Sequence, residues 1–270
     1  MNLLSEFAQP YLIGLIASLL GVPASDGPQL VAWSHAMVKM YELTNSERQA
    51  RAASEAAAHF DAYITLLVRD RVRNPQQDLL SALAHTETEG EKLTERELVS
   101  TCIVLLNAGH EATVNTLGNG IVALMKHRGE WEKVVSGAVP PNVAVEEMLR
   151  WDSPLQLFER WVLEDGVEVA SATLNRGDKV GFLFGSANRD PRQFEAPDKF
   201  IVDRGDTRHV GFGAGIHQCL GAPLARLELE IGLEAVVGHF PDMELAEQPR
   251  RHQTFVLRGY EEVTLRSNGP

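Results

Sequence analysis

The stretch Phe212–Gly221 reads FGAGIHQCLG, and it places a single cysteine, Cys219, in a glycine-rich loop. An apolar run that begins at Ala222 and carries Pro223 in its first turn predicts a helix directly after the loop, over residues 222–239. A sulfur at this point faces free backbone N–H groups and the positive end of the helix dipole, which favours the thiolate form. Because the glycines remove side-chain bulk, a flat group could lie against the loop.

Three other interpretations of this loop are a phosphate-binding loop, a zinc site and a structural cysteine. A GxGxxG phosphate loop needs glycine at position 216, which is Ile216, and the sequence contains no GxxxxGK[ST]. A zinc site needs several Cys and His residues at paired spacings, and His217 with Cys219 are too few. A structural free cysteine stays an alternative for Cys219. The other cysteine, Cys102, lies in the apolar run CIVLL, which predicts a small buried hydrophobic residue.

The composition excludes several classes of protein. The chain has 270 residues, of which 44% are hydrophobic and 23% charged, as expected of a globular protein with a substantial core. Its formal net charge of −12 makes a nucleic-acid partner unexpected. The apolar stretch Tyr11–Val22 is too short to span a bilayer and lacks the basic start of a secretory signal. Two cysteines form no disulfide framework, so we expect a cytoplasmic protein without a membrane partner.

Hydrophobic periodicity and stop signals predict a mainly α-helical fold with small β-sheets. The clearest start signal is Thr94 with Glu97, a capping box that opens a helix running to about His127. Residues 160–185 alternate and carry turn residues, which predicts short strands and hairpins, and the tail 254–266 is also strand-like. The other predicted helices span residues 3–20, 28–43, 46–73, 78–84 and 143–151.

The loop FGAGIHQCLG resembles the haem-binding signature of the cytochrome P450 family, FGxGxHxCxG, at all six fixed positions. The resemblance implies haem b as the cofactor, with Cys219 as the axial thiolate ligand of the iron. His217 would bind one haem propionate, and Phe212 would pack near the sulfur. Arg160 resembles the family position that contacts the second propionate; the alternative is a solvated arginine at a strand start. The glycines that would lie against the haem are Gly213, Gly215 and Gly221.

The segment EEMLR resembles the ExxR motif of the same family. Glu147 and Arg150 stand three apart and share one helix face, so they can pair. The resemblance implies an internal pair that fixes the cysteine loop, whereas the alternative is an ordinary surface ion pair. In the family a PxRF-like segment supplies a further partner. Here FEAPDKF has Lys199, which cannot make the bidentate fork of an arginine, and Arg204 is the other candidate.

The long predicted helix carries AGHEAT, which resembles the oxygen-binding segment of the family. The resemblance implies that Ala108 and Gly109 leave space for dioxygen and substrate. Glu111 would relay protons to the reduced oxygen; the alternative is an exposed helix glutamate. Ala112 stands where most members have a threonine. The hydroxyl appears only at Thr113, which a rotation of about 100° per residue need not turn toward the iron.

The resemblance implies a haem-thiolate monooxygenase that inserts one oxygen atom from O2 into an organic substrate. The segments expected to contact substrate, residues 104–113, 155–158 and 254–255, are largely apolar or small, which predicts an apolar small molecule. Electrons would come from a donor of the ferredoxin and ferredoxin reductase type. Between Arg176 and Arg226, eight Lys and Arg outnumber six Asp and Glu, which favours docking of an acidic donor near Arg208 and Arg226.

The resemblance runs from Phe7 to the end of the chain, and bacterial members of the family carry a further N-terminal third. We therefore expect one domain over residues 1–270 that corresponds to the C-terminal two-thirds of the cytochrome P450 fold. Three functional hypotheses follow: an active monooxygenase, a truncated haem-binding remnant without turnover, and a helical interaction module. An exposed former core face could also drive self-association.

Overall fold

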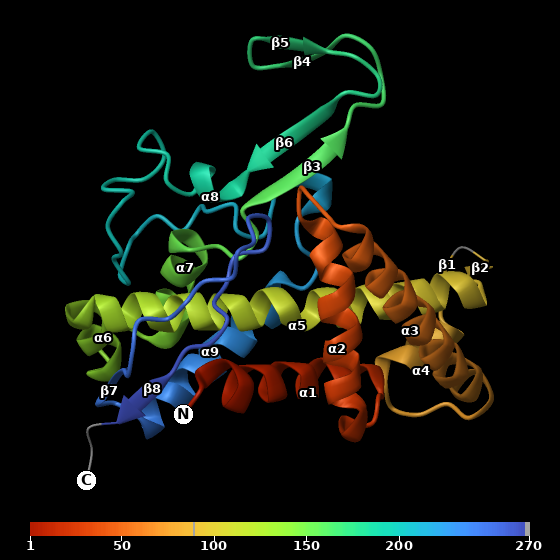
Figure 1. Ribbon diagram of the computed structural model, residues 1–270, viewed down its shortest axis with the longest axis horizontal. Helices are drawn as coiled ribbons and strands as arrows, with labels where there is room; N and C mark the ends of the chain where they lie inside the picture. Colours follow the sequence, from red (N-terminus) through yellow and green to blue (C-terminus); the bar gives the residue numbers. More distant parts are fainter. Residues whose placement is uncertain (89, 268–270) are drawn as a thin grey trace.

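The computed structural model describes residues 1–88 and 90–267, and it is mainly helical, as predicted. Figure 1 shows a layer of helices crossed from side to side by one long helix, α5. A short π-helical turn, Leu4–Ala8, leads into the first helix. The helices are α1 (Gln9–Leu20), α2 (Gly27–Val38), α3 (Glu47–Arg73), α4 (Leu79–His85), α5 (Glu95–Lys126), α6 (Arg128–Val135), α7 (Pro141–Trp151), α8 (Phe184–Ala187) and α9 (Ala222–His239).

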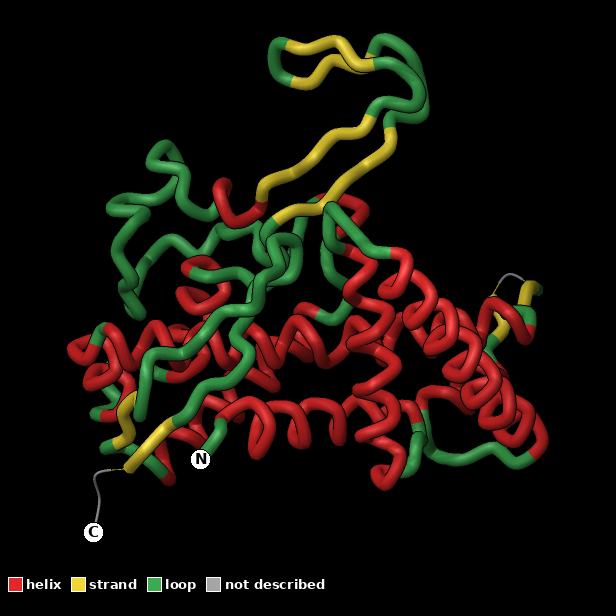
Figure 2. Tube along the Cα trace, viewed as in Figure 1, coloured by secondary structure: helices red, strands yellow, loops and turns green. Residues whose placement is uncertain are grey.

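The described strands form two-stranded antiparallel sheets, which confirms the prediction of small sheets. The pairs are β1 (Glu87–Thr88) with β2 (Glu91–Lys92), β3 (Leu157–Trp161) with β6 (Lys179–Leu183), β4 (Val167–Val169) with β5 (Ala172–Leu174), and β7 (Met243–Leu245) with β8 (Leu265–Ser267). In β3 and β6, Arg160 stands opposite Val180. Figure 2 shows that β3 and β6 lead away from the helices and carry the hairpin of β4 and β5 at their far end.

The structure differs from the sequence prediction in several elements: helices α6 and α8 and strands β1, β2 and β7 were not predicted, and most of the tail differs. Helix α6 was not predicted because one residue, His127, separates it from α5 and caps both helices, so no separate start signal marks the second helix. The tail 254–266 is mostly irregular rather than a strand. The carboxylate of Glu42 accepts hydrogen bonds from the backbone N–H groups of Phe255 (2.8 Å) and Leu257 (3.2 Å). A strand would need such N–H groups for the hydrogen bonds to its neighbouring strand.

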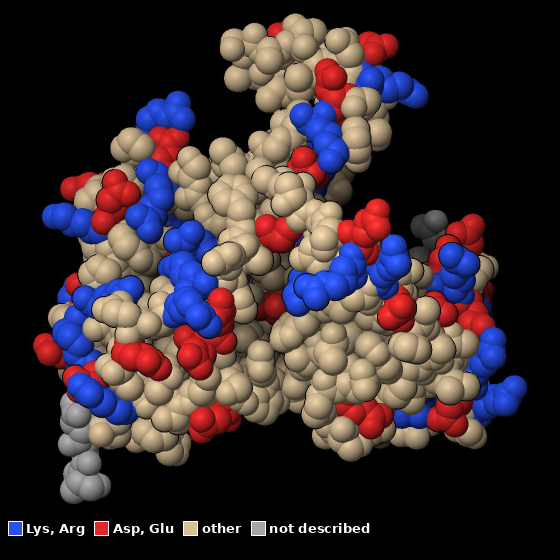
Figure 3. Space-filling model, in the orientation of Figure 1, with Lys and Arg blue, Asp and Glu red and all other residues tan. Residues whose placement is uncertain are grey.

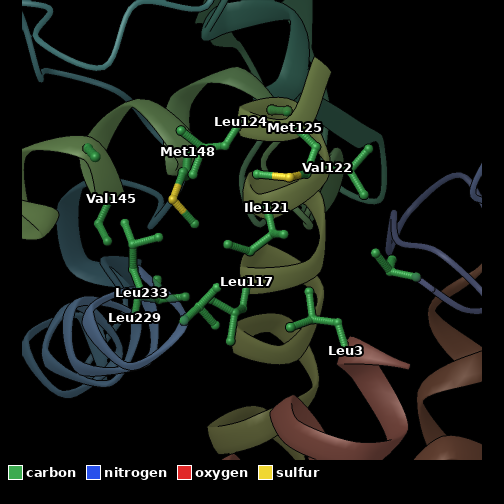
Figure 4. Packing of buried hydrophobic residues seen from close by; sticks show 14 of the residues in the cluster. Leu3, Leu117, Ile121, Val122, Leu124, Met125, Val145, Met148, Leu229 and Leu233 are labelled. Atoms are coloured by element: carbon green, nitrogen blue, oxygen red, sulfur yellow. The ribbon is translucent and has the colours of Figure 1, made fainter. Parts of the chain in front are cut away.

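One hydrophobic cluster lies where α1, α5, α7 and α9 meet, and Figure 4 shows Leu117, Ile121, Met148 and Leu233 pointing into it. The glycines inside α5 allow this packing. A Cβ at Gly118 would lie 2.8 Å from Leu4 Cδ2, and a Cβ at Gly120 would overlap Met148. Side chains of the π-helical turn and of α7 therefore pack directly against the α5 backbone at these two glycines.

A second cluster fills the space between α1, α2, α3, α4 and α5. Phe60, Ile64 and Cys102 are fully buried in it. Burial raises the pKa of the Cys102 thiol to about 11. The prediction that Cys102 is a small buried hydrophobic residue is confirmed.

Candidate functional site

The loop that carries Cys219 runs directly into the first turn of α9. Its fold depends on a few backbone hydrogen bonds: the N–H of Cys219 donates to the carbonyl of Phe212 (2.8 Å), and the N–H of Gly213 donates to that of Val210 (2.9 Å). Gly213 and Gly215 have φ angles of +71° and +65°, a conformation that residues with a Cβ rarely adopt. Gly213 and Gly215 are thus required by the path of the loop.

The side chains around Cys219 lack protein cover. The thiol is exposed, and its apolar neighbours Ile216 and Leu220 are 97% and 89% exposed. A Cβ at Gly215 would meet no atom within 4 Å. Apolar side chains at this exposure leave a surface that a flat apolar group would cover, next to a thiol of the kind that can ligate haem iron. The residues present therefore fit haem.

Behind the loop, Phe212 rests on a cluster of charged side chains. The Arg226 guanidinium lies 4.7 Å from the Phe212 ring centre and pairs with Glu146, at 2.6 Å from Nε to Oε1. His209 Nε2 lies 3.1 Å from the same carboxylate. Burial alone would raise the pKa of Glu146, but His209 and Arg226 outweigh it and lower the value to about 2. Arg226 is thus an ion-paired support of the loop, and less of its charge is available for docking a donor.

Glu147 and Arg150 form an ion pair inside the protein. Arg150 Nε and Nη2 donate to the Glu147 carboxylate at 2.6 and 2.8 Å, and the two side chains are 1% and 2% exposed. Arg204 adds a third bond, from Nε to Oε2 at 3.1 Å. Lys199 contributes its backbone carbonyl, which accepts from Arg150 at 3.1 Å. The alternative of a surface ion pair is therefore excluded, and Arg204, not the amine of Lys199, is the further partner.

Asn188 connects this ion pair to the cysteine loop. Its backbone carbonyl accepts from Arg150 Nη1 at 2.8 Å, and its Oδ1 accepts from the N–H of Val210 at 2.8 Å. Its Nδ2 donates to Ser153 Oγ at 2.8 Å, and its side chain is fully buried. Asn188 was missed from the sequence because it lies in an irregular stretch with no periodic signal. Through it the pair stabilises the start of the loop.

The segment AGHEAT lies in the middle of α5. Ala108 is exposed, Ala112 is half-buried and Thr113 is buried. A Cβ at Gly109 would lie 2.8 Å from Ile16 of α1, so contact with α1 accounts for this glycine without a ligand. That Ala108 and Gly109 leave room for dioxygen stays a prediction.

Glu111 points toward histidines rather than into open solvent. His35 Nε2 of α2 lies 3.1 Å from its Oε2, and the carboxylate side chain is mostly buried. Burial alone would raise the pKa of Glu111, but the contact with His35 and the charges of His35, His110 and His252 lower it. The alternative of an exposed helix glutamate is therefore excluded. His35 was missed from the sequence because only the fold brings α2 against α5.

Arg160 and His217 are not joined in the structure. The Arg160 guanidinium lies 4.6 Å from the Phe158 ring centre and donates to the carbonyl of Glu159 at 2.9 Å. His217 is exposed at the end of the short 3-10 turn Gly215–His217. Within the described residues, no hydrogen bond or ion pair links the two side chains. Their common role toward a haem stays a prediction.

Several apolar side chains on the segments predicted to contact substrate are open. Val104, Phe158 and Phe255 are all exposed, and Val104 stands one turn before Ala108 on α5.

Figure 3 shows acidic and basic side chains interspersed over the face in view rather than separated by sign. Among the described residues, no helix combines the length and apolar character needed to cross a membrane.

Comparison with known proteins gives a consistent result. The family model for cytochrome P450 matches residues 9–135 and 142–259. The polyketide biosynthesis cytochrome P450 PksS of Bacillus subtilis (strain 168) is 41% identical over 268 residues, which cover 98% of this chain and 65% of the relative. The biotin biosynthesis cytochrome P450 of the same organism is 38% identical over 266 residues, which cover 98% of this chain and 67% of the relative.

Solved structures agree in fold. The crystal structure of P450BioI in complex with hexadec-9Z-enoic acid ligated acyl carrier protein superposes with a TM-score of 0.93 at 37% identity, over 99% of this chain and 69% of that chain. The structure of PksS gives a TM-score of 0.91 at 39% identity. The chain spans about two-thirds of the length of these relatives. It belongs to the cytochrome P450 family.

Proposed function

We propose that this chain binds haem b with Cys219 as the axial thiolate and supports a monooxygenase reaction, in which one oxygen atom from O2 enters an apolar organic substrate. The observation that carries the proposal is the exposed Cys219 thiol among open apolar side chains, on a loop tied to the buried Glu147–Arg150 pair. Family membership supports it, since the relatives PksS and the biotin biosynthesis protein are cytochromes P450.

The loop residues would hold the haem from the Cys219 side. When bound, haem supplies oxygen activation, and thiolate donation favours cleavage of the O–O bond. Cys219 would ligate the iron and Phe212 would pack beside the sulfur. His217 and Arg160 would bind the two propionates. The glycines that leave room for the macrocycle would be Gly213, Gly215 and Gly221.

Residues of α5 would serve the opposite face. The Glu111 carboxylate would take up protons and deliver them toward the oxygen side, and its contact with His35 at 3.1 Å orients it. Ala112 offers no hydroxyl, so water or a substrate hydroxyl would complete the route unless Thr113 turns from its buried position. Ala108 with Gly109 would leave space for dioxygen. The exposed Val104, Phe158 and Phe255 would contact an apolar substrate.

Electrons would come from a ferredoxin-type donor with its reductase. Arg208 is the better docking candidate of the two arginines expected from the sequence. Its side chain is 77% exposed, although it is paired with Asp206 at 2.9 Å. Arg226 is paired with Glu146 and packed on Phe212, so its replacement would also disturb the loop.

Isotope incorporation tests this proposal against the haem-binding remnant. The haem-loaded chain, a ferredoxin and reductase pair, NADPH and a panel of apolar substrates would be incubated under ¹⁸O2. The proposal predicts products that carry one ¹⁸O atom and that disappear when Cys219 is replaced by Ser. Haem binding without labelled product for any substrate, under conditions in which the donor reduces the iron, would favour the remnant.

A further inference from the structure

Three side chains away from the cysteine loop gather in one place: His35 of α2, and His110 and Glu111 of α5. His35 Nε2 lies 3.1 Å from Glu111 Oε2, and His110 Nε2 lies 3.6 Å from the same oxygen. One ligand atom of each residue lies within 4.8 Å of the other two. Figure 1 shows α2 crossing α5, and this crossing brings the three together.

Two atoms of this cluster are buried without an aligned hydrogen-bond partner among the described residues: His110 Nε2 and Glu111 Oε2. His110 is 1% exposed, and its Nδ1 lies 2.8 Å from the carbonyl of Leu106. A carbonyl only accepts, so Nδ1 carries the proton. The ring is buried and no aligned acceptor faces Nε2 among the described residues, so the neutral ring with a lone pair on Nε2 is the form that fits this place. Two acceptor atoms thus face each other, an arrangement that costs free energy unless a positive group lies between them.

We propose that His35, His110 and Glu111 form a binding site for a divalent transition-metal ion, with Zn²⁺ as the ion that best fits. Two imidazoles and one carboxylate are a common ligand set of zinc with an open fourth position. Bonds of about 2.0–2.1 Å at a tetrahedral angle put ligand atoms about 3.3 Å apart. The two separations between a histidine and the carboxylate, 3.1 and 3.6 Å, lie on either side of this value, and the ligand atoms of the two histidines lie within 4.8 Å of each other.

The surroundings of the cluster also suit an ion. The bond from His110 Nδ1 to a backbone carbonyl is the support that fixes the ring of a metal-binding histidine. The His35 side chain is 40% exposed, which gives an entry path from solvent and room for a water ligand. A bound ion would hold Glu111 and slow proton delivery. That consequence rests on the proposed function, whereas metal binding does not.

The competing explanation is a proton in place of the metal, with a charged His35 paired to Glu111. The test uses the untagged full chain carrying Cys219→Ser, so that the exposed thiol does not bind metal. Zn²⁺ is titrated by calorimetry and Co²⁺ by its visible absorption. We expect one ion per chain and a Co²⁺ spectrum of a four- or five-coordinate nitrogen and oxygen site.

Variants locate the ion. His35→Gln and Glu111→Gln should each weaken Zn²⁺ binding roughly tenfold or more. The matched control is His239→Gln, because His239 Nδ1 bonds to the Ala235 carbonyl at 2.8 Å but makes no ion pair among the described residues. It should leave the affinity unchanged. Circular dichroism checks that each variant folds, and the partly exposed His35 is the position least prone to misfolding.

Two results would overturn the proposal. One is the absence of stoichiometric Zn²⁺ binding at micromolar concentrations. The other is equal Zn²⁺ affinity in the parent chain and in folded His35→Gln and Glu111→Gln. Neither result depends on haem binding or turnover, so failure here is separate from failure of the proposed function.

Discussion

Replacement of Glu147 by glutamine keeps the side chain's shape and removes its charge. The carboxylate accepts four hydrogen bonds: two from Arg150 at 2.6 and 2.8 Å, one from Arg204 at 3.1 Å and one from the N–H of Ile201 at 2.8 Å. Glutamine offers one acceptor oxygen, and its NH2 group would face guanidinium donors. Glu147→Gln therefore leaves two arginine charges without their carboxylate.

The expected size follows from burial. Removing one partner of a buried ion pair costs about 3–5 kcal/mol, because the other charge stays buried without compensation. The matched control is Glu159→Gln, since Glu159 of β3 pairs with Lys179 of β6 at 3.0 Å while 42% and 44% of the two side chains are exposed. Such surface pairs contribute less than about 1 kcal/mol.

Urea unfolding, followed by circular dichroism, measures both variants. Glu147→Gln should lower the free energy of unfolding by about 3–5 kcal/mol, and Glu159→Gln by less than about 1 kcal/mol. A fall in haem retention is expected only for Glu147→Gln, because its network reaches the loop through Asn188. Equal losses of stability in the two variants would refute the conclusion that burial gives this ion pair its strength.

Three further predictions concern stability and docking. Burial raises the pKa of Glu228 from 4.5 to about 7, so the folded chain holds a proton that the unfolded chain releases. The free energy of unfolding should fall as the pH rises from about 4.5 to 7, and Glu228→Gln should remove that fall. The same dependence of the free energy of unfolding on pH in the parent chain and in Glu228→Gln would contradict this. In thermal unfolding, Gly120→Ala should destabilise the chain, because the added Cβ would overlap Met148. Gly129→Ala has open space around its Cβ and should stabilise the chain by up to about 1 kcal/mol. A Gly120→Ala chain that is more stable than Gly129→Ala would contradict the packing described. Arg208→Gln should slow ferredoxin association in stopped flow at low salt only, and an unchanged low-salt rate contradicts donor docking there.

Local signals predicted most of the helices because those signals act within a few residues. Thr94 and Glu97 form the expected capping box, with the Thr94 N–H donating to Glu97 at 2.9 Å, and α5 begins at the next residue. Helix α9 spans the predicted residues 222–239, since glycines and Pro223 mark its start. Most of the tail 254–266 was wrongly predicted as a strand, and only residues 265 and 266 lie in β8. Glu42, far away in sequence, binds N–H groups of the irregular part.

The candidate site likewise contains contacts that the sequence predicted and contacts that it did not. Spacing within one helix was enough to suggest that Glu147 and Arg150 pair, but not that the pair is buried. The support of the loop by Glu146 and His209 joins residues 63 apart in sequence, and the contact of His35 with Glu111 joins two helices. Such long-range contacts leave no periodic pattern in a single sequence, so only the folded chain reveals them.

The most direct test of Cys219 as the haem ligand is the absorption spectrum of the haem-loaded chain after reduction and addition of carbon monoxide. We predict a Soret band at the position typical of thiolate-ligated haem. It should be lost in Cys219→Ser and kept in Cys102→Ala, which removes the buried cysteine. A band typical of histidine ligation in the parent chain, or a thiolate-type band that survives Cys219→Ser, would contradict the assignment.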